Sequence, residues 1–192
     1  DNDAFQAAWP GVCEGVALIG SVQVKGRASI GGNLCNASPA ADSVPAIIAA
    51  GAIANIVGPV GSREEPVENI VTGPGQTSLA DGELIVSFSF PAKQANSGDC
   101  YLRLTPRTEM DIAIVGAGVN LTLDDDGTCT AARVSIGAVA PTPLLVEDAA
   151  NTLIGTKVND AVLDAMVEAV RAACNPISDK RGTREYRIKT AG

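Results

Sequence analysis

The sequence lacks histidine altogether and contains few aromatic residues. Without histidine among its 192 residues, a Ser-His-Asp triad and a histidine-ligated metal are both excluded. Aromatic residues make up 3% of the chain and hydrophobic residues 46%, so Ala, Val, Ile and Leu must build the core. No apolar run approaches the roughly 18 residues of a membrane-spanning helix, and no secretory signal is visible.

Positive charge is also scarce. The chain has 14 Lys and Arg against 22 Asp and Glu, which gives a formal net charge of −8. Nucleic-acid backbones and anionic membranes attract cationic surfaces, so neither is expected as the main partner. A small anionic ligand remains possible, because local backbone N–H groups can hold it.

The five cysteines match no zinc or iron–sulfur spacing, and their odd number argues against a complete disulfide framework. We therefore expect reduced thiols, no metal site and a cytoplasmic protein. The cysteines are Cys13, Cys35, Cys100, Cys129 and Cys174.

The first half of the chain consists of short apolar segments separated by turns. In chain order it predicts helical turns at 3–19, a short strand in 21–30, a glycine-rich loop at 28–42, a buried helix from Ser43, a strand at 52–58 and turns over 58–82 with one brief helix near Val67. Segment 83–90 alternates as a strand and places Leu84, Val86, Phe88 and Phe90 on one face.

The second half predicts antiparallel strands and then helices. Strands are expected at 100–104, 111–123 and 128–139, and Asp-Gly at 126–127 is a strong hairpin signal between the last two. Helices are expected at 146–155, 159–174 and 183–192. This order predicts an α+β fold in which helices cover one face of the sheet.

The segment Ile30-Gly31-Gly32-Asn33 is the first candidate for ligand binding. Successive glycines let backbone N–H groups converge on an anion, Ser29 and Asn33 add polar side chains, and the Asp42 carboxylate could accept hydrogen bonds from ligand hydroxyls. An ordinary turn with a helix cap explains the same residues. No Gly-Lys-Ser/Thr follows, so this is not a P-loop.

Other candidates have simpler explanations. Gly116 and Gly118 lie inside an expected strand rather than at a strand-to-helix turn, and "TGPGQT" at 72–77 is typical of a turn. Three aspartates at 124–126 are expected to be solvated at a hairpin tip. Arg103 and Arg107 lie near Asp111 in the sequence, and surface ion pairing is the simplest interpretation.

Five segments together resemble the FAD-binding medium subunit of molybdenum hydroxylases, a family that includes aerobic carbon monoxide dehydrogenases and the flavin portion of xanthine dehydrogenases. The resemblance covers essentially the whole chain. The segments are "ASIGGNLCNASPAAD", "GELIVSFSFP", "RTEMDIAIVGAGVNL", "GTCTAARVSIGAVAPTP" and "SDKRGTREYR".

The resemblance implies two domains. Residues 1–96 would be the C-terminal part of a vanillyl-alcohol-oxidase-type FAD-binding domain. Residues 97–192 would be the smaller domain that ends the family's flavin protein, with a three-stranded antiparallel sheet packed on helices. The family's second Gly-Gly loop, near its N-terminus, is not in this chain, which begins at Asp1 without Met. We therefore expect an N-terminally truncated subunit.

The resemblance also implies roles for individual residues. Ser29, Gly32 and Asn33, with the intervening Ile30 and Gly31, match positions that hold the FAD pyrophosphate and ribityl region. Asp42 matches a carboxylate that bonds the ribityl chain. The remaining matched positions lie near the flavin ring: Ile85, Arg103 (Lys in xanthine-oxidising members), Asp111 and Ile112.

The implied function is an oxidoreductase subunit that relays electrons through FAD. The molybdopterin large subunit would pass electrons to the iron–sulfur small subunit, which would pass them to FAD. FAD would then reduce an external acceptor such as a quinone or NAD. No residue here need be a catalytic acid or base, and the isolated fragment is expected to be inactive. Two alternatives remain: a docking or scaffold fragment that binds no FAD, and an unrelated α+β ligand-binding protein.

Overall fold

The structure is a computed structural model that describes residues 2–108 and 110–192. Its first half contains five short helices, a three-stranded antiparallel sheet in the order β2-β1-β5 and a two-stranded ribbon, β3-β4. The elements are α1 (Asp3–Ala8), α2 (Pro10–Ala17), α3 (Val22–Lys25), α4 (Ile30–Cys35), α5 (Ser43–Ala49), β1 (Ile53–Gly58), β2 (Gly61–Pro66), the 3-10 helix η1 (Val67–Asn69), β3 (Val71–Gly73), β4 (Gln76–Thr77) and β5 (Leu84–Ser89).

The second half is an antiparallel sheet in the order β6-β7-β8-β9 followed by three helices. The elements are β6 (Ser97–Leu104), β7 (Val115–Leu123), β8 (Cys129–Gly137), β9 (Leu144–Leu145), α6 (Glu147–Leu153), α7 (Asp160–Ala173) and α8 (Arg184–Ala191). The predicted strands, hairpin and helices of this half are confirmed. Beyond the three expected strands, the two-residue β9 adds a fourth, which is too short to give a period-2 signal.

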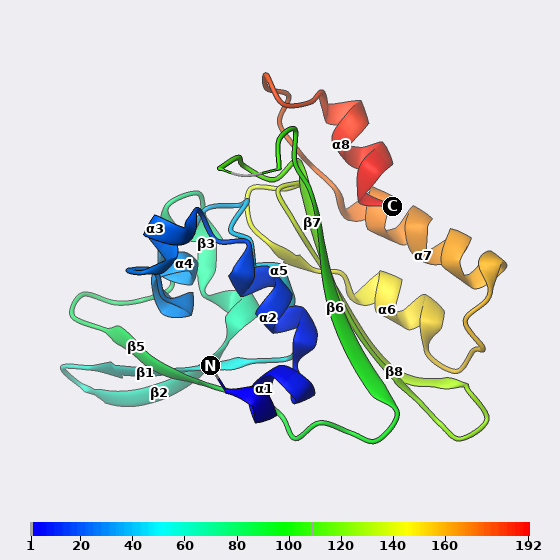
Figure 1. Cartoon of the computed structure of the whole chain (residues 1–192), viewed down its shortest axis with the longest axis horizontal. Coiled ribbons are helices and arrows are strands. Elements are labelled where there is room, and N and C mark those ends of the chain that lie inside the picture. Colours follow the sequence, from blue (N-terminus) through cyan, green and yellow to red (C-terminus); the bar gives the residue numbers. More distant parts are fainter. Residues whose placement is uncertain (1, 109) are drawn as a thin grey trace.

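Helices lie on both sides of this sheet (Figure 1). The C-terminal helices α6 and α8 contact β8 and β7, while α2 contacts β6 and α5 contacts β7 and β8. The second half of the chain thus has the predicted arrangement, with its own helices on one face of the sheet. The first half supplies the helices of the second face, and the two halves meet along this sheet.

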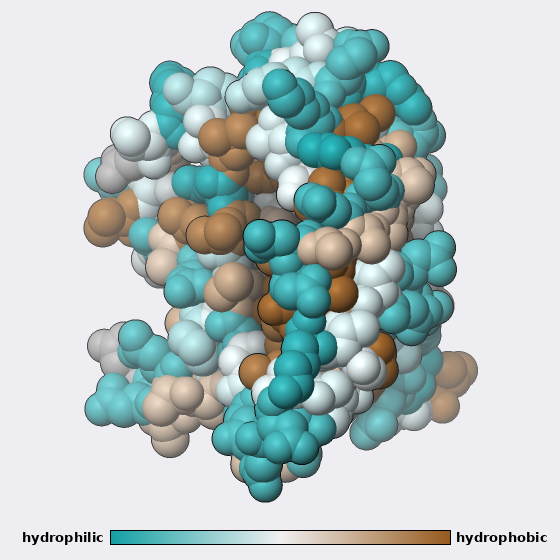
Figure 2. All heavy atoms as spheres, turned by 90° about the vertical axis from the view of Figure 1, so that its right-hand side faces the viewer, coloured by the Kyte–Doolittle hydropathy of each residue, from teal (hydrophilic) through white to brown (hydrophobic). Residues whose placement is uncertain are grey.

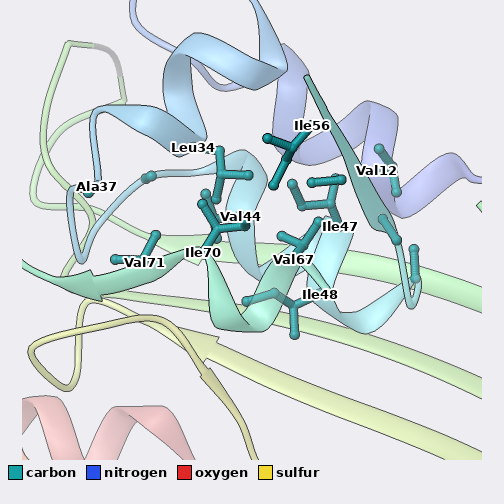
Figure 3. Close-up of a cluster of buried hydrophobic side chains, with 14 of the residues drawn as sticks. Val12, Leu34, Ala37, Val44, Ile47, Ile48, Ile56, Val67, Ile70 and Val71 are labelled. Atoms are coloured by element: carbon teal, nitrogen blue, oxygen red, sulfur yellow. The ribbon is translucent and has the colours of Figure 1, made fainter. Parts of the chain in front are cut away.

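The core is aliphatic, as the composition predicts, and falls into two clusters. The first joins α2, α4, α5, β1 and the turn around η1, with Leu34, Val44 and Ile47 fully buried at its centre (Figure 3). The second joins β7 and β8 to the C-terminal helices and includes Ile136, Leu153 and Val170.

Helix α7 shows the expected apolar stripe. The Asn159 side chain caps its first turn by accepting a hydrogen bond from the Val162 amide at 3.1 Å. Val170 is buried, and Val162 and Met166 pack against the second cluster. The outer surface of this side of the molecule is mainly hydrophilic (Figure 2). Among the described residues, no helix is long and apolar enough to cross a membrane.

Glycines let α5 lie close to the sheet. A Cβ atom on Gly118 would be 2.5 Å from the Pro45 carbonyl oxygen, and one on Gly137 would be 2.8 Å from the Pro45 ring. A Cβ on Gly116 would be 2.5 Å from the Tyr101 hydroxyl. Gly116 and Gly118 therefore serve close packing around the sheet, in agreement with their placement in a strand rather than a cofactor fingerprint.

Two local predictions were wrong. Segment 28–42 is not all loop, because α4 begins at Ile30, where the Ser29 hydroxyl accepts a hydrogen bond from the Gly32 amide at 3.0 Å and burial of Leu34 outweighs the low helix propensity of glycine. Segment 21–30 contains no strand. Ser21 caps the short helix α3 instead, since its hydroxyl accepts from the Val24 amide at 3.4 Å.

The face predicted for β5 was also wrong. Ile56 pairs with Ile85 and Asn55 pairs with Ser87, so Val86 is an extra residue at a β-bulge. The bulge reverses the alternation. Ile85 and Phe88 therefore pack against the first cluster, whereas Leu84 and Val86 are exposed.

Candidate functional site

Gly31 of α4 is not required by the fold. It has helical backbone, where glycine costs about 1 kcal/mol relative to alanine, and a Cβ there would meet only the Phe88 ring at 4.0 Å. A Cβ on Gly32 would lie 3.1 Å from the Ser29 hydroxyl, so Gly32 also serves the cap of the helix. The missing side chain of Gly31 leaves open space beside the first turn of the helix, which suits close approach of a ligand.

The start of α4 offers hydrogen-bond donors to that space. The amides of Ile30 and Gly31 occupy the first two helical positions, where the helix itself provides no acceptor. The Ile30 side chain packs against the first hydrophobic cluster and so fixes this turn on the protein. The arrangement presents backbone N–H groups to an acceptor such as a phosphate oxygen.

Asn33 fastens α4 to α5. Its Oδ1 atom accepts hydrogen bonds from the Ser43 hydroxyl at 2.7 Å and from the Ser43 amide at 3.4 Å. Only the Nδ2 group of Asn33 is left as a donor for a ligand. Ser43 is the first residue of α5, which begins without a side-chain cap, and its hydroxyl is used in the contact with Asn33.

Asp42 and Arg103 form a buried ion pair between the two halves of the chain. Asp42 Oδ2 lies 3.0 Å from Arg103 Nη1, and the side chains are 13% and 7% exposed. Arg103 Nη1 also donates to the Leu18 carbonyl at 3.2 Å. Arg103 thus joins the end of α2 to the residue that precedes α5. The expected surface position of this arginine was wrong.

Burial raises the pKa of Asp42, and the Arg103 charge and the nearby Tyr101 hydroxyl oppose that rise. Burial and the Asp42 charge in turn raise the pKa of Tyr101, which therefore stays protonated. The second carboxylate oxygen, Asp42 Oδ1, is buried, and no donor among the described residues meets hydrogen-bond geometry with it, although the Tyr101 hydroxyl lies close enough to affect the Asp42 pKa. An acceptor without a well-placed donor fits a ligand hydroxyl, because an unpaired buried polar atom costs about 1–3 kcal/mol.

A groove of about 220 Å³ brings together three of the predicted residues, Arg103, Asp111 and Ile112. Leu18, Gly20 and Met110 complete its wall. The Ile112 side chain is 51% exposed, which is unusual for isoleucine and provides an apolar surface. The groove therefore combines a buried cation with an exposed apolar side chain.

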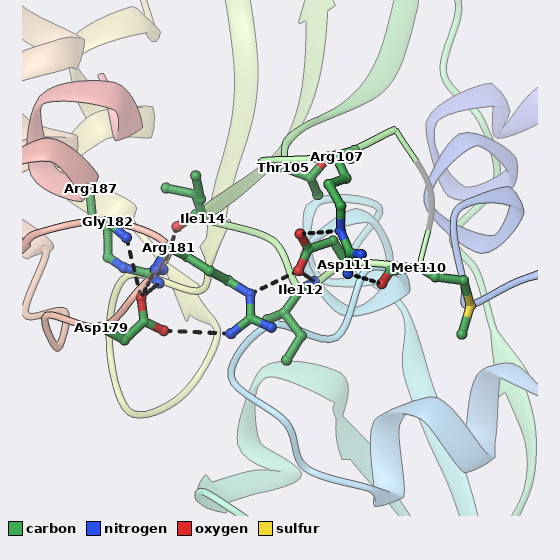
Figure 4. A network of polar contacts seen from close by, with 10 residues as sticks. All are labelled: Thr105, Arg107, Met110, Asp111, Ile112, Ile114, Asp179, Arg181, Gly182 and Arg187. Carbon is green, nitrogen blue, oxygen red and sulfur yellow. Dashed lines mark hydrogen bonds and ion pairs between the residues drawn. The ribbon is translucent and has the colours of Figure 1, made fainter.

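Asp111 lies in a network of arginines (Figure 4). Arg181 Nε donates to its Oδ1 at 2.9 Å and Arg107 Nε to its Oδ2 at 3.2 Å. Hydrogen bonds from Arg181 and from the Ile112 amide lower the pKa of Asp111 to about 2, so the carboxylate is ionised. The predicted ion pair of Arg107 is present, and the Arg107 side chain is 69% exposed.

Ile85 is not brought to this groove. It lies on β5 and packs against the first hydrophobic cluster. The nearest link from its strand to α4 is Phe88, whose ring faces Gly31. Its matched role at the flavin ring stays a prediction.

Sequence reasoning missed four participants, Leu18, Gly20, Met110 and Arg181. Leu18, Gly20 and Met110 carry no charged or hydrogen-bonding side chain that would signal a site, so only the fold shows that they line the groove. Arg181 contacts Asp111 across 70 residues, and no local pattern signals such a pair. Among the described residues, no group of three Cys, Asp or Glu is arranged to hold a metal ion.

Two family models match the chain. The first, "FAD binding domain in molybdopterin dehydrogenase", matches residues 2–93. The second, "CO dehydrogenase flavoprotein C-terminal domain", matches residues 101–192. Together they cover all but a few residues, so the match of the five segments is not accidental. This excludes the alternative that the chain is an unrelated α+β ligand-binding protein.

Several relatives are similar over nearly the whole chain. The putative xanthine dehydrogenase FAD-binding subunit of Escherichia coli is 32% identical over 98% of this chain and 64% of the relative. The carbon monoxide dehydrogenase medium chain of Afipia carboxidovorans is 34% identical over 100% of this chain and 66% of the relative. The chain thus spans just under two thirds of these relatives' length.

The fold is also similar to solved structures. A chain of reconstituted CO dehydrogenase from Oligotropha carboxidovorans superposes with a TM-score of 0.94 at 33% identity, over 99% of this chain and 66% of that one. Quinoline 2-oxidoreductase from Pseudomonas putida 86 superposes with a TM-score of 0.87 at 25% identity, over 100% of this chain and 66% of that one.

Proposed function

Because the chain belongs to the FAD-binding medium subunits of molybdenum hydroxylases, we propose that its FAD site extends from the start of α4 to the Arg103 groove. One observation carries the proposal: the fold links the predicted residues of α4 to those of the groove, with Ile85 alone lying apart. Asn33 bonds Ser43, the adjacent Asp42 pairs with Arg103, and Arg103 shares a groove with Asp111 and Ile112.

The groups along this proposed site match the parts of FAD. The amides of Ile30 and Gly31 and the Ser29 hydroxyl suit the pyrophosphate, which needs donors and a close backbone approach. Asp42 suits the ribityl hydroxyls, which need an acceptor. Arg103 and the exposed Ile112 suit the isoalloxazine, which has a polar edge and an apolar face.

FAD would supply the redox chemistry, and the chain binds it, orients it and sets its electrostatic environment. The buried Arg103 cation beside the ring would favour added negative charge there. We propose that this chain works in a cytoplasmic assembly, in which a molybdopterin subunit passes electrons to an iron–sulfur subunit and that subunit passes them to FAD. Relatives that are named as medium chains support an assembly of several chains.

We also propose a domain boundary near residue 96. The limits of the two family models, at 93 and 101, support it, as do the two separate hydrophobic clusters. The Asp42–Arg103 pair would then cross the domain interface.

Titration of the purified chain with FAD tests this function. Saturable quenching of flavin fluorescence, lost when Arg103 is replaced by Met but retained when the half-exposed Arg171 is replaced by Met, is the expected result. Well-folded protein that gives no saturable change would favour the scaffold alternative. Visible circular dichroism of the bound flavin would report whether the ring is held in one orientation.

A further inference from the structure

Arg181, in the segment between α7 and α8, contacts Asp111 in the connection between β6 and β7, next to Ile112. We propose that Arg181 is a positioning residue, which fixes Asp111 and, through it, the backbone of Ile112 at the groove wall. This inference rests on the proposed FAD site for its functional meaning. The contacts from which it is argued all lie within the chain and involve no ligand.

A single carboxylate oxygen connects Arg181 to Ile112. Asp111 Oδ1 accepts a hydrogen bond from Arg181 Nε at 2.9 Å and another from the Ile112 amide at 2.8 Å. The Asp111 side chain is only 7% exposed, so its charge needs a fixed cation. Displacing this carboxylate would therefore displace the Ile112 backbone.

Arg181 is itself held in place. Its backbone amide donates to Asp179 Oδ1 at 2.9 Å, and the same oxygen accepts from Arg187 Nη2 at 2.9 Å. Arg187 is 3% exposed and donates to the carbonyl of Ile114 at 2.8 Å and to that of Ala138 at 3.1 Å. Figure 4 shows Arg187 and Arg181 reaching opposite ends of residues 111–114. The connection between β6 and β7 is thus held at Asp111 by Arg181 and at Ile114 by Arg187. Both arginines are fixed by their hydrogen bonds to Asp179.

Arg107 contacts the same carboxylate but cannot provide this anchor. Its side chain is 69% exposed, against 21% for Arg181, and exposed ion pairs contribute little. It also belongs to the loop that is being held, since it bonds the Met110 carbonyl at 3.1 Å. Arg107 therefore provides a matched control, with the same side-chain type on the same carboxylate.

The anchor is tested without cofactor by amide hydrogen exchange of the full chain. In the Arg181→Gln variant, the Ile112 amide should exchange at least about tenfold faster, because a charge-assisted hydrogen bond is lost. Arg181→Lys, which keeps the charge, should restore most of the protection. Arg107→Gln should leave Ile112 within about threefold of the wild type. Unchanged Ile112 exchange in Arg181→Gln, or equal loosening of β7 and α8, would overturn the anchor.

The functional part is tested on the FAD-loaded chain. Arg181→Gln should change the visible circular dichroism of the flavin and weaken FAD binding roughly tenfold, measured at a temperature at which both it and Arg107→Gln are fully folded. Faster Ile112 exchange with an unaltered flavin spectrum and affinity would overturn the positioning role. If the wild type bound no FAD, the proposed function would fail, while the exchange data would still decide whether Arg181 anchors Ile112.

Discussion

Asp42 and Arg103, 61 residues apart, form a buried ion pair that joins the two halves of the chain. Desolvation makes such a pair expensive to break, because the remaining charge has no solvent around it. The pair therefore links the stability of the domain interface to the geometry of the proposed flavin site.

Replacing either partner of the Asp42–Arg103 pair should destabilise the chain. Arg103→Met leaves a buried carboxylate without its cation and should lower the free energy of unfolding by about 3–5 kcal/mol at pH 7. Asp42→Asn should cost at least as much, since the more buried Arg103 guanidinium keeps its charge without a counter-ion, whereas the Asp42 carboxyl can take up a proton. Urea denaturation measures both changes.

The double variant Asp42→Asn/Arg103→Met should be more stable than Arg103→Met alone, because no buried carboxylate remains. Arg171→Met is the control, since its partner Glu168 is 73% exposed and the change should cost below about 1 kcal/mol. Equal destabilisation by Arg103→Met and Arg171→Met would show that the Asp42–Arg103 pair is energetically unimportant.

Replacing Gly31 by Leu should weaken FAD binding without unfolding the chain. The protein leaves space for the side chain, and the ligand would need the same space. Gly98→Leu is the matched control, because Gly98 is exposed on β6 and a Cβ there meets nothing within 4 Å. Flavin fluorescence titration should show roughly tenfold or greater loss of affinity for Gly31→Leu only. If the two variants bound FAD with identical affinities, the pyrophosphate would not bind beside Gly31.

Gly118→Ala should destabilise the chain by about 1–3 kcal/mol. Its new methyl group would meet the Pro45 carbonyl oxygen at 2.5 Å, and backbone cannot move aside as a flexible side chain can. Gly98→Ala should be neutral or stabilising by comparison. Thermal unfolding of both variants gives the comparison, and a neutral Gly118→Ala would contradict the close packing of α5.

Ionised Asp111 should stabilise the fold at neutral pH. Its pKa of about 2 in the folded chain lies below the roughly 3.9 of an unfolded chain, so the stabilisation is present above about pH 4 and is lost as pH falls through 2. Carboxyl-carbon NMR should report a pKa near 2 in the wild type and a higher pKa in Arg181→Gln. A wild-type value near 4 would contradict the arginine network.

The sequence was informative where local patterns decide structure. The strand alternation around 111–123 and the Asp-Gly turn predicted the hairpin, the pattern of 159–174 predicted α7, and the five matching segments predicted the family. The sequence was not informative where contacts between distant residues determine the local structure. Burial of Leu34 makes a helix from a glycine-rich segment, and the bulge at Val86 reverses β5.

The site was predictable in part for the same reason. Asn33 is linked to Arg103 through the buried Ser43 and the adjacent Asp42, and Arg103 shares a groove with Asp111; that these residues bind FAD stays a prediction. The sequence could not predict their contacts, since only the fold brings Arg103 to Asp42, 61 residues away, and Arg181 to Asp111, 70 residues away. Ile85 was matched by family position alone, and the structure places it on the first hydrophobic cluster.

Titration of the whole chain with FAD, followed by flavin fluorescence and visible circular dichroism, tests the central claim most directly. We predict saturable binding with an induced flavin signal, weakened by Gly31→Leu and Arg103→Met and unchanged by Gly98→Leu. A folded chain that shows no saturable binding, or binding that none of these substitutions alters, would contradict the assignment of the FAD site to α4 and the Arg103 groove.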